Sequence, residues 1–374
     1  MAADLSKMAD SILNPFVENW KKQGKPVLGF TCSYVPKEII HAAGILPYRI
    51  RARGSGERTM GDVRMSQITC PFSRSILELA LKGEYNFLDG LVSMNSCECM
   101  RRMCDNWVSE IGADFFHFLS VPYKSSAEAV EWFRHELDIL RENLEKSFDV
   151  TVTDENLRDS VNTYNKTRKL LRKLYDLRKE KNPKISWSEI QRVVVMSSAM
   201  PIEEYNTQLE SLIDEVESRN GINNYRARLM LIGTPLDNPS NSEAIEDLGG
   251  LVVTDLSCFG TISFWDPFDS DGDPLDIIAK GYLNDSRCPR MPGRGGERHN
   301  LIKEMAESFD IDGIVFERMM FCNIWGGETM SLEKDMKELN IPMLIIDSEY
   351  APGSEGQIGT RVEAFLEMIE GRAK

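Results

Sequence analysis

The sequence predicts an α/β protein with two parallel-sheet domains, and three observations support this fold class. Apolar runs of roughly four to eight residues alternate with helical patterns near both ends of the chain. Residues 125–225, between these two regions, show helical periodicity alone. The chain of 374 residues is also longer than one typical domain. We therefore expect two Rossmann-like domains, 1–124 and 226–374, joined by a helical bridge over 125–225.

The N-terminal domain begins with a helical pattern over 4–22 and continues with three expected strands. These strands are short apolar runs, at 26–30, 88–94 and 115–121. Helices are expected after Pro36 and from Pro71, because proline suits the first turn of a helix. This alternation is typical of a parallel sheet whose faces are covered by helices.

The bridge shows helical periodicity, and the C-terminal domain returns to the alternation of strands and helices. In the bridge, apolar side chains such as Phe133 and Leu137 share one helical face. Later helices are expected at 186–197, 202–219, 241–248, 272–283, 297–309, 329–339 and 356–370. The C-terminal strands are expected at 228–233, 251–254, 313–317 and 342–346. The resumed alternation predicts a second parallel sheet.

Composition and charge narrow the functional classes. The 44 basic and 59 acidic residues give a net charge of −15, which argues against nucleic acid as the main partner. The first residues lack the basic-then-apolar pattern of a signal peptide. No apolar run approaches the roughly 20 residues of a membrane helix, so no membrane is expected. We expect a cytoplasmic, reduced protein whose eight cysteines are thiols or metal thiolates.

Six of the cysteines lie where a strand ends or a helix begins. They are Cys32, Cys70, Cys97, Cys258, Cys288 and Cys322. Two of them follow strands that begin with Asp-Gly, and two others precede a proline, so the two halves of the chain partly repeat. Ligands gather at the carboxyl ends of strands in open parallel sheets. Two such edges facing each other would place the six thiols around one cleft between the domains.

Thiols in this pattern indicate a metal centre, and iron–sulfur clusters suit dispersed cysteine ligands. Zinc is the rival, although its structural sites usually take ligand pairs two to four residues apart. Burial as small apolar side chains is the other alternative. Cys99 and Cys104 follow Cys97 on one helix and are interpreted as spare thiols, with Cys99 able to replace Cys97. No P-loop motif is present, and no residues stand out as catalytic.

Several motifs give the chain a family resemblance that runs nearly end to end. It resembles the superfamily of 2-hydroxyacyl-CoA dehydratase subunits, ATP-dependent (class I) benzoyl-CoA reductase subunits and double-cubane cluster proteins. The motifs are Cys32-x-x-x-Pro36-x-Glu38-Ile39 with Ala42-Ala43-Gly44, Cys70-Pro71, Asn95-Ser96-Cys97 with Arg101-Arg102 and Asp105-Asn106-Trp107, Cys258, Cys288-Pro289, Phe321-Cys322, and the tail from Gly356-Gln357 through Thr360-Arg361 to Phe365.

The resemblance implies a division of the six cysteines. Dehydratase-type subunits bind a [4Fe-4S] cluster through cysteines that match Cys70, Cys97 and Cys322. Double-cubane proteins bind an [8Fe-9S] cluster through six cysteines, and Cys32, Cys258 and Cys288 stand at what look like the matching places. The flanks of Cys288 differ most from that pattern. An [8Fe-9S] double cubane is therefore the favoured cofactor, with a single [4Fe-4S] cluster as the alternative.

The stretch from Asn95 to Trp107 looks most like benzoyl-CoA reductase subunits. This implies an iron–sulfur subunit of an aromatic acyl-CoA reductase that stores and passes on low-potential electrons. Its implied partners are a larger homologous subunit, which bears the substrate-site cluster, and an ATP-hydrolysing iron–sulfur activator. The alternatives are a stand-alone double-cubane reductase homodimer, a 2-hydroxyacyl-CoA dehydratase subunit with one [4Fe-4S] cluster, and a non-catalytic electron carrier or scaffold.

Overall fold

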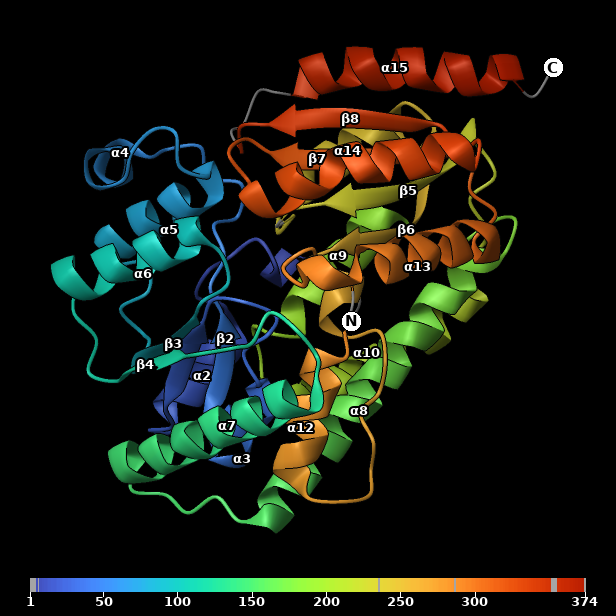
Figure 1. Cartoon of the computed structure of the whole chain (residues 1–374). Coiled ribbons are helices and arrows are strands. Elements are labelled where there is room, and N and C mark those ends of the chain that lie inside the picture. The colour runs from blue at the N-terminus through green and yellow to red at the C-terminus, as the bar shows by residue number, and fades with distance from the viewer. Residues whose placement is uncertain (1–4, 6, 235, 286, 351–354, 373–374) are drawn as a thin grey trace.

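The computed structural model describes residues 5, 7–234, 236–285, 287–350 and 355–372. It contains two four-stranded sheets, in the orders β2-β1-β3-β4 and β6-β5-β7-β8 (Figure 1). Every strand pair in both sheets is parallel. The α/β prediction with two parallel sheets is confirmed. The second sheet repeats the strand order of the first, so β5 corresponds to β1, β6 to β2, β7 to β3 and β8 to β4.

The first sheet lies in the N-terminal part of the chain. Its strands are β1 (Val27–Phe30), β2 (Leu46–Arg49), β3 (Gly90–Met94) and β4 (Phe116–Leu119). The helices of this part are α2 (Pro15–Lys22), α3 (Lys37–Ala42), α4 (Thr59–Arg64), α5 (Pro71–Leu81) and α6 (Glu98–Glu110). The sequence did not predict β2, a strand of four residues that contains Pro47. Proline is tolerated there because β2 is an edge strand.

The second sheet lies in the C-terminal part. Its strands are β5 (Ala227–Gly233), β6 (Gly250–Ser257), β7 (Gly313–Met319) and β8 (Met343–Ser348). All residues of β5 and β6 are buried, as expected for parallel strands covered on both faces. The helices are α11 (Ser240–Asp247), α12 (Pro274–Leu283), α13 (Gly295–Ser308), α14 (Asn323–Glu338) and α15 (Glu355–Arg372). Figure 1 shows α15 beside β8, which it contacts.

Four helices connect the sheets in sequence. They are α7 (Ala127–Phe148), α8 (Asp154–Asp176), α9 (Trp187–Met196) and α10 (Ile202–Ser218). Helix α8 packs on α3 of the N-terminal part, on α10 and on α12 of the C-terminal part, and α7 also contacts α3 and α12. The bridge therefore holds the two sheets against a shared helical layer. The domain boundaries after residues 124 and 225 stay a prediction.

Three local expectations are wrong. The helical pattern over 4–22 is broken, because the Asn14 side chain accepts N–H bonds from Phe16 and Val17 and starts α2 at Pro15; residues 1–4 and 6 lie outside the described chain. Helix α14 begins at Asn323 instead of 329. Pro289 follows Cys288 in a turn and starts no helix, whereas Pro71 is the first residue of α5.

Within the part of the chain that the structure describes, no helix is long and apolar enough to span a membrane.

Candidate metal centre

The local fold places five of the six cysteines after a strand or at the start of a helix, and the sixth in a loop. Cys32 follows β1 and Cys258 follows β6 directly, while Cys288 lies in the turn between α12 and α13. The other three are N-cap residues, Cys70 of α5, Cys97 of α6 and Cys322 of α14. Cys97 and Cys322 follow the corresponding strands β3 and β7. Cys32 and Cys258 follow strands that do not correspond, so the repeat of the two halves is partial.

Cys70, Cys97 and Cys322 come together, and we call them the first thiol group. Burial raises the pKa of Cys70 to about 12, and electrostatic repulsion from Cys322 and Cys99 adds to the shift. Burial also raises the pKa of Cys97 well above its ordinary value, with further contributions from Cys70, Cys99 and Cys322. These mutual effects place the sulfurs within electrostatic range of one another.

Cys32, Cys258 and Cys288 form the second thiol group. Burial raises the pKa of Cys258 well above its ordinary value, and Cys288 and Cys32 raise it further. Burial raises the pKa of Cys288 to about 12, with Cys32 as the next contribution. Cys322 also raises the pKa of Cys258, so the two thiol groups adjoin each other.

Both groups combine residues from the two halves of the chain. The first group takes Cys70 and Cys97 from the N-terminal part and Cys322 from the C-terminal part. The second group reverses this ratio, with Cys32 from the N-terminal part and Cys258 and Cys288 from the C-terminal part. Electrostatic coupling thus links cysteines from both halves of the chain within each group and joins the two groups through Cys322 and Cys258.

Backbone N–H groups surround the first thiol group. N–H groups of Phe72 and Ser73 donate to Cys70, and that of Met100 donates to Cys97. The thiol of Cys322 accepts from Ile324 and Trp325, which lowers a pKa that burial raises. Free N–H groups and the positive end of the dipole at a helix N-terminus stabilise a thiolate. Three helices, α5, α6 and α14, therefore direct positive potential at this group.

Arginine side chains surround the second thiol group. The guanidinium of Arg49 interacts with Cys258, Cys32 and Cys288, in decreasing order. Arg290 and Arg298 lower the pKa of Cys288 against the larger effect of burial. The Arg298 Nη1 atom also donates to the Cys288 carbonyl oxygen at 3.1 Å. The sequence analysis missed these arginines, since no motif or spacing marks them.

The two cysteines interpreted as spare thiols differ in position. Cys99 lies with the first group, where its Sγ accepts the N–H of Cys70 at 3.5 Å and lies 3.9 Å from the Phe321 carbonyl oxygen. The Cys104 Sγ lies 2.8 Å from Ser93 Oγ, and neither thiol group contributes to its pKa shift. The Cys97-x-Cys99 spacing was the one sequence signal for Cys99.

The donor set fits an iron–sulfur group. Metal binding removes the proton from a thiol, so buried thiols with raised pKa values release protons on loading. Several buried donors beside the cysteines have no hydrogen-bond partner, namely Thr31 Oγ1, Ser96 Oγ and Trp325 Nε1. They stand one to three residues from Cys32, Cys97 and Cys322. Among the described residues, no group of three or more His, Cys, Asp or Glu side chains could hold a single metal ion.

Each thiol group adjoins a cavity. A cavity of about 470 Å³ beside the first group is lined by Cys322, Phe321, Arg318 and Ile68. Phe321 precedes Cys322 with a φ of 62°, in the left-handed region that disfavours a phenylalanine backbone. Its side chain and that of Ile68 are 43% and 74% exposed. Strain and exposed apolar side chains therefore coincide at this edge of the metal centre.

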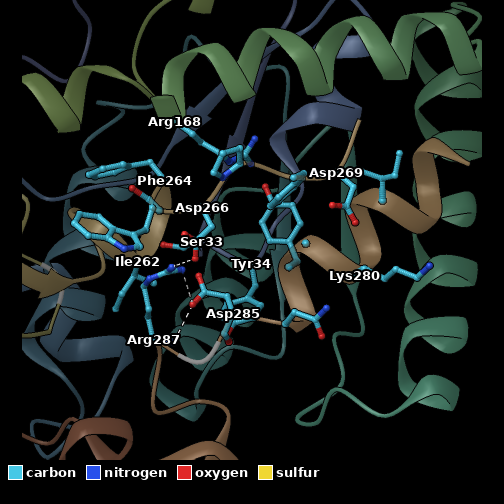
Figure 2. A pocket seen from close by; sticks show the side chains of 18 residues that line it. Ser33, Tyr34, Arg168, Ile262, Phe264, Asp266, Asp269, Lys280, Asp285 and Arg287 are labelled. Carbon is cyan, nitrogen blue, oxygen red and sulfur yellow. Dashed lines mark hydrogen bonds and ion pairs between the residues drawn. The ribbon is translucent and has the colours of Figure 1, made fainter. Parts of the chain in front are cut away.

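The second cavity, of about 210 Å³, is lined by neighbours of Cys32 and Cys288 in sequence. Figure 2 shows Ser33 and Tyr34 on one side and Arg287 reaching toward Asp266 and Asp285. The Tyr34 hydroxyl donates to the Asp285 carbonyl oxygen at 3.0 Å. Burial raises the pKa of Tyr34 well above its ordinary value, so this hydroxyl stays protonated. Aromatic side chains of Phe264, Phe268 and Tyr282 complete the wall.

Comparison with known proteins identifies a family and several relatives of this chain. Residues 32–369 match the family described as the 2-hydroxyglutaryl-CoA dehydratase D-component. A benzoyl-CoA reductase subunit of Thauera aromatica is 26% identical over 94% of this chain and 93% of that protein. The (R)-phenyllactyl-CoA dehydratase beta subunit of Clostridium sporogenes is 25% identical, covering 96% and 97%. The (R)-2-hydroxyglutaryl-CoA dehydratase beta subunit of Acidaminococcus fermentans is 24% identical, covering 94% of each.

These relatives are named as subunits of reductases and dehydratases that act on acyl-CoA thioesters. The match starts at Cys32 and ends within α15, so it includes all six cysteines and both thiol groups. The chain belongs to the 2-hydroxyglutaryl-CoA dehydratase D-component family of enzyme subunits.

Proposed function

We propose that the chain is the iron–sulfur subunit of an ATP-dependent benzoyl-CoA-type reductase. Cys32, Cys70, Cys97, Cys258, Cys288 and Cys322 would bind an [8Fe-9S] double cubane, which supplies storage of low-potential electrons. The observation that carries the proposal is the electrostatic coupling of six buried or partly buried thiols as two adjoining groups of three. One cubane needs only one such group, so the second group favours the larger cluster.

In this proposal, residues of this chain bind the cluster and exclude water from it. The first turns of α5, α6 and α14 direct N–H groups at the first thiol group, and buried Trp325 and Phe72 exclude water near it. Thiolate ligands suit a low reduction potential, which the N–H donors around the first thiol group raise in part. Saturating one ring double bond takes an electron pair and two protons. This chain would deliver electrons, and the sister subunit would hold the substrate.

The proposed partners are a larger homologous subunit and an ATP-hydrolysing iron–sulfur activator. The exposed Ile68 and Phe321 support a protein contact at the cavity beside Cys322. An activator bound there would place its own cluster near the first thiol group. The relatives are also named as subunits of larger enzymes.

Anaerobic determination of iron and acid-labile sulfide per chain tests this proposal. We expect about eight irons and about nine sulfides for a double cubane. About four irons with about four sulfides would move the assignment to a single cubane, and zinc without sulfide would refute an iron–sulfur role. Turnover of benzoyl-CoA, given activator and ATP, then tests the reaction.

A 2-hydroxyacyl-CoA dehydratase subunit with one [4Fe-4S] cluster is the second candidate. It is favoured by the first thiol group, which has its own backbone donors from three helices and a cavity large enough for a small ligand. Turnover of a 2-hydroxyacyl-CoA, at about four irons per chain, would support this candidate over the reductase.

A further inference from the structure

Arg49 is a buried cation beside Cys258 of the second thiol group. It is the last residue of β2, and its side chain is only 5% exposed. Its Nη1 atom donates to the Cys258 carbonyl oxygen at 2.5 Å, and its guanidinium lies 3.8 Å from the centroid of the Phe259 ring. Its buried Nε atom has no hydrogen-bond partner. The side chain is therefore held beside Cys258, and its Nε donor is left without a partner.

The charge of Arg49 has thiols as its strongest partners. Burial lowers the pKa of Arg49, and Cys258, Cys32, Asp237 and Cys288 oppose this shift in that order. In the described chain, no carboxylate forms an ion pair with its guanidinium. Asp237 already accepts the N–H groups of Ala52 and Arg53 and the hydroxyl of Tyr350. A buried charge without a counter-charge is costly, so a compensating anion is expected there.

Some other buried arginines have carboxylate partners, whereas Arg51, Arg178 and Arg290 form no ion pair within the described chain and donate to backbone carbonyl oxygens. Arg168 pairs with Glu38, and Arg287 pairs with Asp266 and Asp285. Arg74, beside the first thiol group in sequence, pairs with Asp62 at 2.5 Å. Arg49 thus differs from these arginines in the same protein, because the groups arranged around it are sulfurs.

We propose that Arg49 is the counter-cation of the iron–sulfur group on Cys32, Cys258 and Cys288, and that it raises the reduction potential of that group. The inference rests on the proposed six-cysteine cluster. Each added electron increases the negative charge on the sulfurs and irons, and a fixed guanidinium nearby stabilises this reduced form. Electrons would then rest on the side of the second thiol group, away from the cavity beside Cys322.

The test compares reduction potentials of Arg49→Met and the unmodified chain, purified anaerobically with its co-purifying subunits. After iron and sulfide analysis, each sample is titrated with dithionite and followed by electron paramagnetic resonance. We expect the equilibrium constant for reducing the cubane on the second thiol group to fall at least tenfold. This corresponds to about 59 mV for one electron. Arg49→Lys, which keeps the positive charge, should recover most of this loss.

Arg318→Met is the matched control at the first thiol group. Arg318 interacts with Cys322, but its side chain is 28% exposed and pairs with Asp347 at 2.7 Å. Its removal should change the equilibrium constant less than about threefold, because water and Asp347 already screen its charge. An equal shift in both variants would overturn a special role for Arg49.

The remaining outcomes are also decisive. If Arg49→Met keeps about eight irons and its potential is unchanged, the inference is overturned while the double cubane stands. About four irons in the unmodified chain would refute both proposals. Arg49→Gln keeps a donor for the Cys258 carbonyl and covers the case in which the methionine variant fails to load. Iron loss in the Met and Gln variants but not in Lys supports the counter-cation, and iron loss in all three overturns it.

Discussion

The first and second thiol groups both concentrate buried sulfurs, but different parts of the protein compensate their charge. The first group lies at the N-termini of α5, α6 and α14 and takes backbone N–H donors. The second group has Arg49, Arg290 and Arg298 around it. Backbone donors are part of the fold and survive most substitutions, whereas side-chain cations can be removed one at a time. The second group should therefore be the more sensitive to mutation.

The groups also differ in their surroundings. The first adjoins an open cavity with exposed Ile68 and Phe321, where a partner protein can approach. The second adjoins the smaller cavity of Figure 2, which is lined by Tyr34 and Arg287, close in sequence to Cys32 and Cys288. This contrast suggests a division of labour, with entry of electrons at the first group and storage at the second.

Cys322→Ala should have the largest effect, because Cys322 interacts with Cys70 and Cys97 and also with Cys258. We expect the iron content to fall from about eight to below about four per chain. Iron and sulfide analysis of anaerobically purified protein checks this. Cys104→Ala serves as the control, since Cys104 is buried but lies outside both groups. Equal iron in the two variants would rule out Cys322 as a shared ligand.

Cys258→Ala should affect the second group alone. We expect about four irons to remain, held by the first group, with a spectrum typical of one cubane. The same purification, followed by electron paramagnetic resonance of the reduced protein, provides the measurement. Iron content equal to that of the unmodified chain would favour the three-cysteine ligand set, in which only the first thiol group binds iron.

Two buried ionisable side chains, one in each sheet, should give opposite pH dependences. Burial raises the pKa of Asp255 on β6 to about 6, so the folded state binds more protons than the unfolded state between about pH 4 and 6. Its contribution to stability therefore falls by about 3 kcal/mol as pH rises through that window. Burial lowers the pKa of His117 on β4 to about 4, and its contribution to stability rises by about 3 kcal/mol between about pH 4 and 6.5.

Urea unfolding of the cluster-free chain at about pH 4.5 and pH 7 measures both effects. Relative to the unmodified chain, Asp255→Asn should gain stability as pH rises, because it lacks the costly ionisation. His117→Gln should lose relative stability over the same change. If the unfolding free energies of both variants change with pH in parallel with that of the unmodified chain, Asp255 and His117 do not control the pH dependence of stability.

The smallest effects should come from the unpaired hydroxyls next to the cysteines. Ser96 and Thr31, one beside each thiol group, have buried hydroxyls without hydrogen-bond partners. In the cluster-free chain, Ser96→Ala and Thr31→Val should each stabilise by about 1 kcal/mol, because an unsatisfied polar group is removed. In the loaded protein this gain should vanish if the hydroxyls donate to the cluster. An equal gain in both states would indicate that neither hydroxyl faces it.

The sequence predicted much of the fold, because most strands and helices carry strong local patterns. The strands ahead of Cys97 and Cys322 begin with Asp-Gly and were placed correctly, and Pro71 marked the start of α5. Strand β2 was missed because four residues with a proline and an arginine carry no apolar pattern. Its pairing with β1 comes from tertiary packing, and Arg49 at its end was missed for the same reason.

The candidate site was predicted less completely. Spacing indicated six cysteines at sheet edges, and family resemblance divided them into the two sets that the structure brings together. Their role as ligands stays a proposal. The place of Cys99 depends on the orientation of α6 toward the Cys70 backbone, which no local pattern encodes. The arginines around the second group depend on contacts between distant segments, as Arg49 and Cys258 show.

The unequal sharing of cysteines between the two halves has a consequence for biosynthesis. Neither set of three is complete until the ribosome has made Cys288 and Cys322, late in the chain. With the proposed ligands, cluster insertion must follow translation and the docking of both sheets against the bridge helices. Once inserted, the cluster would tie the C-terminal half to the N-terminal half at two places, as a cross-link that iron chelation can open.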